Sequence, residues 1–81
     1  MIITEIFVDH KPDTLIIAEI QGETDKYNVS FVDGIYFCNC CDFHYRSGFS
    51  EYLDDKIVGK KVEQYKCKHI KFLENYLLKY N

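Results

Sequence analysis

Residues 2–8 and 27–32 alternate between apolar and polar positions with the period of two that is typical of half-buried strands, and residues 14–21 are rich in apolar and β-branched side chains. Polar residues interrupt the alternation at intervals, and Asp33-Gly34 is the strongest short signal for a β-hairpin turn. The pattern therefore predicts a series of antiparallel strands that ends in a hairpin. The predicted strands cover 2–8, 14–21, 27–32 and 35–40, with polar turns at 11–13 and 22–26.

The last segment places apolar residues at three- and four-residue intervals, which predicts an amphipathic helix from about residue 68 to residue 80. A shorter helix is expected over 51–58, with Ser50 as its cap and Gly59 at its end. The expected fold class is therefore α+β: a small antiparallel β-sheet of three or four strands followed by a C-terminal α-helix. The apolar helix positions are Ile70, Leu73, Leu77 and Tyr80.

Composition favours one small globular domain over residues 1–81. The chain is 47% hydrophobic and 28% charged, and a core of this size is thin enough to benefit from an additional tie. No apolar run approaches the roughly 18 residues of a membrane span. Glu5 and Asp9 interrupt the segment where a signal peptide would be apolar. We expect a cytoplasmic, intracellular protein without a membrane partner.

The four cysteines introduce candidate chemistry, because intracellular cysteines at this density indicate metal binding or catalysis before disulfides. Cys38 and Cys40 lie at the end of the predicted hairpin, where residues i and i+2 share a face. Cys67 and His69 lie at the start of the predicted C-terminal helix. Two ligands from each element make a Cys3His set, which holds zinc tetrahedrally in closed structural sites. The spacing predicts one structural Zn²⁺.

Other interpretations of these residues remain open. The cysteines are also compatible with two disulfides, with inert buried thiols or with a Cys-X-Cys redox centre. Cys41 and His44 compete as metal ligands; we expect Cys41 to be a spare, semi-buried thiol and His44 to be a surface group or a neighbour of the ligands. His10 lies beside a predicted turn without a matching partner, and we expect it to be exposed.

The order of these features resembles the SWIM-type zinc finger. The family pattern of Cys-X-Cys, a variable spacer and Cys-X-His is similar to "CNCCDFHYRSG" followed by "CKHIKFLENYLL", and the resemblance spans about residues 27–78. Family members commonly carry proline where Cys41 stands. The 26-residue spacer between Cys40 and Cys67 is long for the family, so 49–66 is interpreted as an insertion.

The sequence argues against an enzyme. Four protein ligands leave no open position at which a metal could activate water. The chain shows no paired carboxylates and no Ser/His/Asp set. It also lacks a glycine-rich phosphate loop, because its four glycines are scattered.

Charge is distributed unevenly, and this favours a nucleic-acid partner. The net charge of −3 combines −5 over residues 1–40 with +2 over residues 41–81. The SWIM resemblance implies DNA transactions, and lysines contact phosphates without needing a particular motif. An ordinary solvated basic face is the alternative. The candidate nucleic-acid-binding residues are Arg46, Lys60, Lys61, Lys66, Lys68 and Lys71.

A protein partner is the second class of function. Seven tyrosines and six phenylalanines exceed what so small a core can bury, and aromatic residues are enriched in interfaces. An edge strand such as 2–8 would also allow homo-oligomers. In this interpretation the zinc site stabilises an interaction module or homodimerising adaptor that does not touch nucleic acid.

Overall fold

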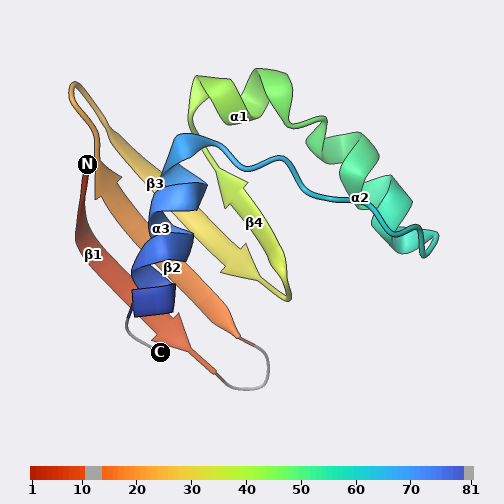
Figure 1. Ribbon diagram of the computed structural model, residues 1–81, viewed down its shortest axis with the longest axis horizontal. Coiled ribbons are helices and arrows are strands. Elements are labelled where there is room, and N and C mark those ends of the chain that lie inside the picture. Colours follow the sequence, from red (N-terminus) through yellow and green to blue (C-terminus); the bar gives the residue numbers. More distant parts are fainter. Residues whose placement is uncertain (11–13, 80–81) are drawn as a thin grey trace.

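The computed structural model describes residues 1–10 and 14–79, and it is an α+β fold (Figure 1). Four antiparallel strands form one sheet in chain order, so each strand pairs with the next. The predicted turn at 11–13 and the helix position Tyr80 lie outside the described residues. The strands are β1 (Ile2–Asp9), β2 (Leu15–Gln21), β3 (Lys26–Val32) and β4 (Ile35–Cys38); the helices are α1 (Cys41–Arg46), α2 (Phe49–Ile57) and α3 (Lys68–Lys79).

The predicted hairpin joins β3 to β4. Asp33 and Gly34 adopt positive φ angles of 52° and 82°, as both central residues of a two-residue hairpin turn require, and Val32 pairs with Ile35 across the turn. The return strand ends at Cys38 and not at residue 40 as predicted, because the chain leaves the sheet there.

One face of the sheet packs against α3, as Figure 1 shows. Alternation along β2 buries Ile16, Ala18 and Ile20 on that face. Ile70 and Leu73 of α3 are fully buried against them, so the predicted amphipathic helix supplies the other half of the core. None of the helices in the described part of the chain is long and apolar enough to span a membrane.

The two short helices lie beside β4 and differ from the prediction. No helix was expected at 41–46, and α1 forms because Cys40 acts as its N-cap: its sulfur accepts a hydrogen bond from the Phe43 backbone N–H at 3.3 Å. The predicted start of α2 was also wrong. The helix begins at Phe49, and its N-cap is Gly48 in a left-handed conformation with φ 55°, not Ser50.

Aromatic packing holds α1 and α2 to the sheet. The fully buried ring of Phe43 meets Phe37 of β4 and Phe49 of α2, with ring centroids 5.4 and 5.5 Å apart. Tyr52 stacks on Phe49 one turn further along α2. Several of the aromatic residues counted in the sequence therefore form a second small cluster at the β4 side of the sheet.

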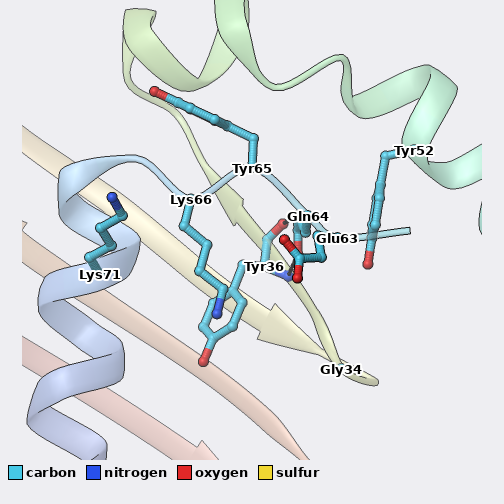
Figure 2. Close-up of a pocket in the computed structure, with 8 residues that line it drawn as sticks. All are labelled: Gly34, Tyr36, Tyr52, Glu63, Gln64, Tyr65, Lys66 and Lys71. Carbon is cyan, nitrogen blue, oxygen red and sulfur yellow. Dashed lines mark hydrogen bonds between the residues drawn. The ribbon is translucent and has the colours of Figure 1, made fainter. Parts of the chain in front are cut away.

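The segment between α2 and α3 protects the outer edge of β4. The backbone N–H of Tyr36 donates a hydrogen bond to Gln64 Oε1 at 2.9 Å, and Gln64 Nε2 donates one to the Tyr36 carbonyl. Figure 2 shows both residues in a hollow of about 610 Å³ that Tyr52 and Lys66 also line. The amide of Gln64 thus replaces one residue of a neighbouring strand, and β4 is not open for pairing at this position.

Candidate metal centre

The first half of the site is built where β4 leaves the sheet. Cys38 is the last residue of the strand and pairs with Val29 on the face that packs against α3. Cys40 keeps an extended backbone, with φ −76° and ψ 158°, before α1 begins. Because extended residues i and i+2 point to the same side, both thiols face the start of α3.

The second half is the start of α3. The Cys67 carbonyl accepts the Lys71 N–H at 3.0 Å, so Cys67 directly precedes the first turn. His69 follows inside that turn, and its ring packs on Tyr27 of β3 with centroids 4.3 Å apart. Its Nδ1 atom lies 3.7 Å from Cys38 Sγ and 3.9 Å from Cys67 Sγ.

These two halves form a compact, buried cluster. One ligand atom from each of the four residues can be chosen so that all lie within 4.8 Å of one another, and all four residues are buried. Ligands around a tetrahedral zinc, with bonds of about 2.0–2.3 Å, are separated by about 3.5–3.8 Å. The histidine–thiol distances are therefore close to what a tetrahedral metal needs. The cluster consists of Cys38, Cys40, Cys67 and His69.

The two ring nitrogens of His69 have different surroundings. Nε2 is buried and has no hydrogen-bond partner among the described residues. Nδ1 is the nitrogen that faces the sulfurs of Cys38 and Cys67, so it is the atom that would coordinate a metal, and the proton would then be carried on Nε2.

Electrostatics place the first negative charge of the cluster on Cys67. The hydrogen bond that the Cys38 thiol donates to it lowers the pKa of Cys67 to about 5. The same hydrogen bond raises the pKa of Cys38, and burial raises it further to a smaller extent. Burial also raises the pKa of Cys40. A cation is therefore attracted to one existing thiolate, and it must displace the protons of the other two thiols.

The two alternative ligands lie outside this cluster. Cys41 opens α1 and is exposed, which corrects the expectation of a semi-buried thiol. The expectation assumed that the strand continued past Cys40, whereas the helix turns this side chain toward solvent. His44 is exposed on the same helix, where its ring meets Tyr45. His10 is exposed, as expected. The four cysteines are free thiols, so no disulfide joins them.

The candidate cationic residues divide between two hollows. Arg46, Lys66, Lys68 and Lys71 line one of about 400 Å³, together with Asp42 and Tyr65. Lys60 and Lys61 line another of about 500 Å³, next to Lys56. The first hollow, which we call the basic hollow, adjoins the metal centre because Lys66 and Lys68 flank Cys67 in the sequence.

Several of these cations are already paired. Lys66 Nζ contacts Glu74 and lies 5.6 Å over the Tyr36 ring, Arg46 contacts Asp42 at 3.2 Å, and Lys60 contacts Asp55 at 3.6 Å. Within the described residues, Lys68 and Lys71 make no ion pair. Of these pairs, only Asp42 and Arg46 stand at the i,i+4 spacing that brings two side chains together on a helix. The other pairs have no such spacing, so the sequence did not indicate them.

No protein-family model, curated protein or solved structure matches the chain. The resemblance to the SWIM-type zinc finger therefore depends on the Cys-X-Cys and Cys-X-His spacings and their places at a hairpin end and a helix start. The structure defines an α+β protein with a buried Cys3His cluster that is suited to a metal ion.

Proposed function

We propose that the chain is a structural zinc-binding module of the SWIM type, not an enzyme, which binds nucleic acid and in particular DNA. The observation that carries the metal assignment is the buried set of three thiols and one imidazole within 4.8 Å. Soft sulfur and nitrogen donors in a tetrahedral set favour zinc over magnesium or calcium. Because protein atoms fill all four positions, the metal would hold the fold together and would not activate water.

The basic hollow supports the nucleic-acid part of the proposal. Lys68 and Lys71 lie in the first turn of α3, where the helix dipole adds to their positive charge. Tyr65 lines the same hollow and donates a 2.5 Å hydrogen bond to Asp42, which also pairs with Arg46. A phosphate would bind Lys68 and Lys71 first and compete with Asp42 for Arg46.

Metal binding and phosphate binding are coupled in this arrangement. Lys68 follows Cys67 directly, so coordination of Cys67 and His69 would fix the first turn of α3 and the direction of both lysines. Lys66 and Lys60 would contribute less, because each already contacts a carboxylate. Lys61 lies in the second hollow and would add only long-range attraction.

The test measures zinc content and then DNA affinity against salt concentration. One zinc per chain is expected. Replacing Lys68 and Lys71 together by glutamine should flatten the slope of log K against log salt by about two units on duplex DNA, since each phosphate contact contributes about 0.9. The double change should leave the zinc content at one per chain. Single-stranded DNA of the same sequence shows which form is preferred.

A matched control removes the same charge elsewhere. Lys26 pairs with Glu19 on the sheet, and Lys79 is at the opposite end of α3, so replacing both by glutamine should leave the slope nearly unchanged. If both double variants flatten the salt slope equally, DNA binding depends only on the net charge of the protein and not on the basic hollow. Absence of binding at low salt would overturn the nucleic-acid proposal and leave the protein-interaction module as the function.

A further inference from the structure

Three hollows adjoin one another along the segment that joins α2 to α3. The hollow of about 610 Å³ beside β4 shares Tyr65, Lys66 and Lys71 with the basic hollow. It also shares Glu63 with the second hollow, of about 500 Å³. The basic hollow and the second hollow have no lining residue in common among those described, so the 610 Å³ hollow connects them. A ligand longer than one hollow can therefore follow all three.

The middle hollow, which we call the aromatic hollow, is lined by three tyrosines. Figure 2 shows that they come from different elements: Tyr36 from β4, Tyr52 from α2 and Tyr65 from the segment between α2 and α3. The volume of about 610 Å³ is within the range of pockets that hold small organic groups. Aromatic rings in the wall of a groove give flat surfaces on which unpaired bases stack.

The hollows on both sides of the aromatic hollow are rich in cations. Four of the ten Lys and Arg residues of the chain line the basic hollow, and three more line the second hollow. The carboxylates that line the three hollows are Asp42 and Glu63, and Asp55 and Glu74 pair with two of the lysines. Cations therefore outnumber carboxylates. The cationic residues are Arg46, Lys66, Lys68 and Lys71 in the basic hollow, and Lys56, Lys60 and Lys61 in the second.

Tyr65 is the residue at which the aromatic and basic surfaces meet, because it lines both hollows. Its hydroxyl donates a 2.5 Å hydrogen bond to Asp42, and its ring packs partly against the core, so the direction of the ring is fixed. A ring that is already ordered loses little freedom when a base stacks on it. The other two tyrosines are less available, because Lys66 lies over Tyr36 and Tyr52 is buried.

We propose that the three hollows bind single-stranded DNA, with phosphates in the basic hollow and the second hollow and a base in the aromatic hollow, stacked on Tyr65. This inference rests on the proposed nucleic-acid function and specifies its ligand. The order of basic, aromatic and basic surfaces matches a strand in which each base lies between two phosphates. A duplex does not fill the aromatic hollow in this way, because its bases are paired and stacked on one another.

The flexibility of a single strand also changes which cations it reaches. A duplex that contacts the basic hollow is attracted by Lys61 only at long range. A single strand can bend along the segment between α2 and α3 and bring a phosphate to Lys61, which lines the second hollow. Lys61→Gln should therefore flatten the slope of log K against log salt by about 0.7 on single-stranded DNA and leave the duplex slope nearly unchanged.

Fluorescence anisotropy tests the base site with an oligothymidine of about twelve nucleotides and a duplex of the same length. The full chain, loaded with zinc, should bind the single strand about tenfold more tightly than the duplex, as one stacked base contributes. Tyr65→Leu removes the aromatic face, so it should weaken single-strand binding about tenfold and leave duplex affinity unchanged. Tyr65→Phe keeps the face and loses only the bond to Asp42, so it should retain most of the affinity.

A matched control changes a tyrosine outside the groove. Tyr45 on α1 is 81% exposed and lines none of the three hollows, so Tyr45→Leu should leave both affinities unchanged. A Tyr45→Leu variant that loses as much single-strand affinity as Tyr65→Leu would contradict the base site. Circular dichroism compares the fold of each variant with wild type, and the Lys61→Gln slopes test the path of the strand even if Tyr65→Leu unfolds.

The outcomes separate this inference from the proposed function. If the duplex binds as tightly as the single strand, or if Tyr65→Leu weakens both forms equally, the aromatic hollow is not a base site. The inference is then wrong, while DNA binding itself stands. Equal flattening of both salt slopes by Lys61→Gln likewise overturns the path of the strand. If neither form of DNA binds at low salt, the proposed function and the inference are both wrong.

Discussion

Cys40 has two structural roles, and they explain how one residue connects the sheet, a helix and the candidate metal centre. Its sulfur accepts the Phe43 N–H and so begins α1, while the same sulfur belongs to the buried cluster. Hydrogen bonds from backbone N–H groups to cysteine sulfurs stabilise the thiolate form that a metal requires. Tyr27 holds the His69 ring in place from the sheet side. The centre is thus supported from β3, β4 and α3 together.

The first prediction compares two cysteines. Cys67→Ser removes the thiol with the lowest pKa in the cluster and leaves only three ligands, so zinc binding should be lost or weakened by several orders of magnitude. Cys41→Ser changes an exposed thiol outside the cluster, so one zinc per chain should remain. Metal analysis after gel filtration measures both. Loss of zinc from the Cys41 variant would contradict the ligand set.

Sequence alone could predict which residues come together, because two i,i+2 pairs at element ends leave few other geometries. It could not predict the exposure of Cys41, which depends on the single residue at which β4 ends. Contacts such as Tyr27 with His69 join residues that are distant in the sequence. Such contacts have no local pattern, and they appear only when the sheet and helix are packed.

At the scale of elements, strands and the long helix were predictable since each has a strong period or a strong turn. Asp33-Gly34 determined the hairpin, and apolar spacing determined α3. The short helices were predicted less well: α1 was not expected, and α2 was expected at 51–58 but begins two residues earlier, because both starts use unusual caps. A cysteine caps α1 and a left-handed glycine precedes α2, whereas prediction relies on serine, threonine, aspartate or asparagine.

The second prediction concerns the edge of β4. Gln64→Leu keeps the size of the side chain but removes both hydrogen bonds to the Tyr36 backbone. The free energy of unfolding should fall by about 1–3 kcal/mol, because a partly buried N–H and carbonyl lose their partners. Urea denaturation of the zinc-loaded protein measures this loss. Hydrogen exchange at the Tyr36 amide should accelerate at the same time.

The same variant should also change assembly. With the edge of β4 open, strands of different copies can pair edge to edge, so species larger than the wild-type protein should appear in sedimentation. Gln64→Glu is the control, since it keeps the acceptor for the Tyr36 N–H and adds a charge that discourages pairing. A Gln64→Leu protein as stable as wild type would show that the amide does not protect this edge.

At the scale of the whole molecule, the cluster connects parts that are otherwise weakly joined. Cys38 and Cys40 end the sheet, and Cys67 and His69 begin α3, with α1, α2 and the return segment between them. A metal bound to all four closes this loop and fixes α3 on the sheet. Structural zinc contributes on the order of 10 kcal/mol in small domains, whereas a core of this size supplies about 3–5 kcal/mol. Most of the stability should therefore come from the metal.

The last prediction follows from that balance. A strong chelator should unfold at least the part from β3 to α3, because removing the metal leaves three buried thiols and the His69 ring without the ion that joins them. A reductant without chelator should have no effect, since no disulfide joins the cysteines. Circular dichroism against temperature, with and without each reagent, measures both effects. Readdition of zinc to the chelated chain should restore the helical signal.

The pattern of outcomes separates the metal from its alternatives. If reductant unfolds the chain and chelator does nothing, the cysteines form disulfides and the metal assignment is wrong. If neither reagent acts, the apolar contacts of Ile70 and Leu73 with the sheet hold α3 without help, and the cluster would be an inert set of buried thiols. Only unfolding by chelator, reversed by zinc, agrees with a metal that ties the helix to the sheet and thereby fixes the lysines of the basic hollow beside it.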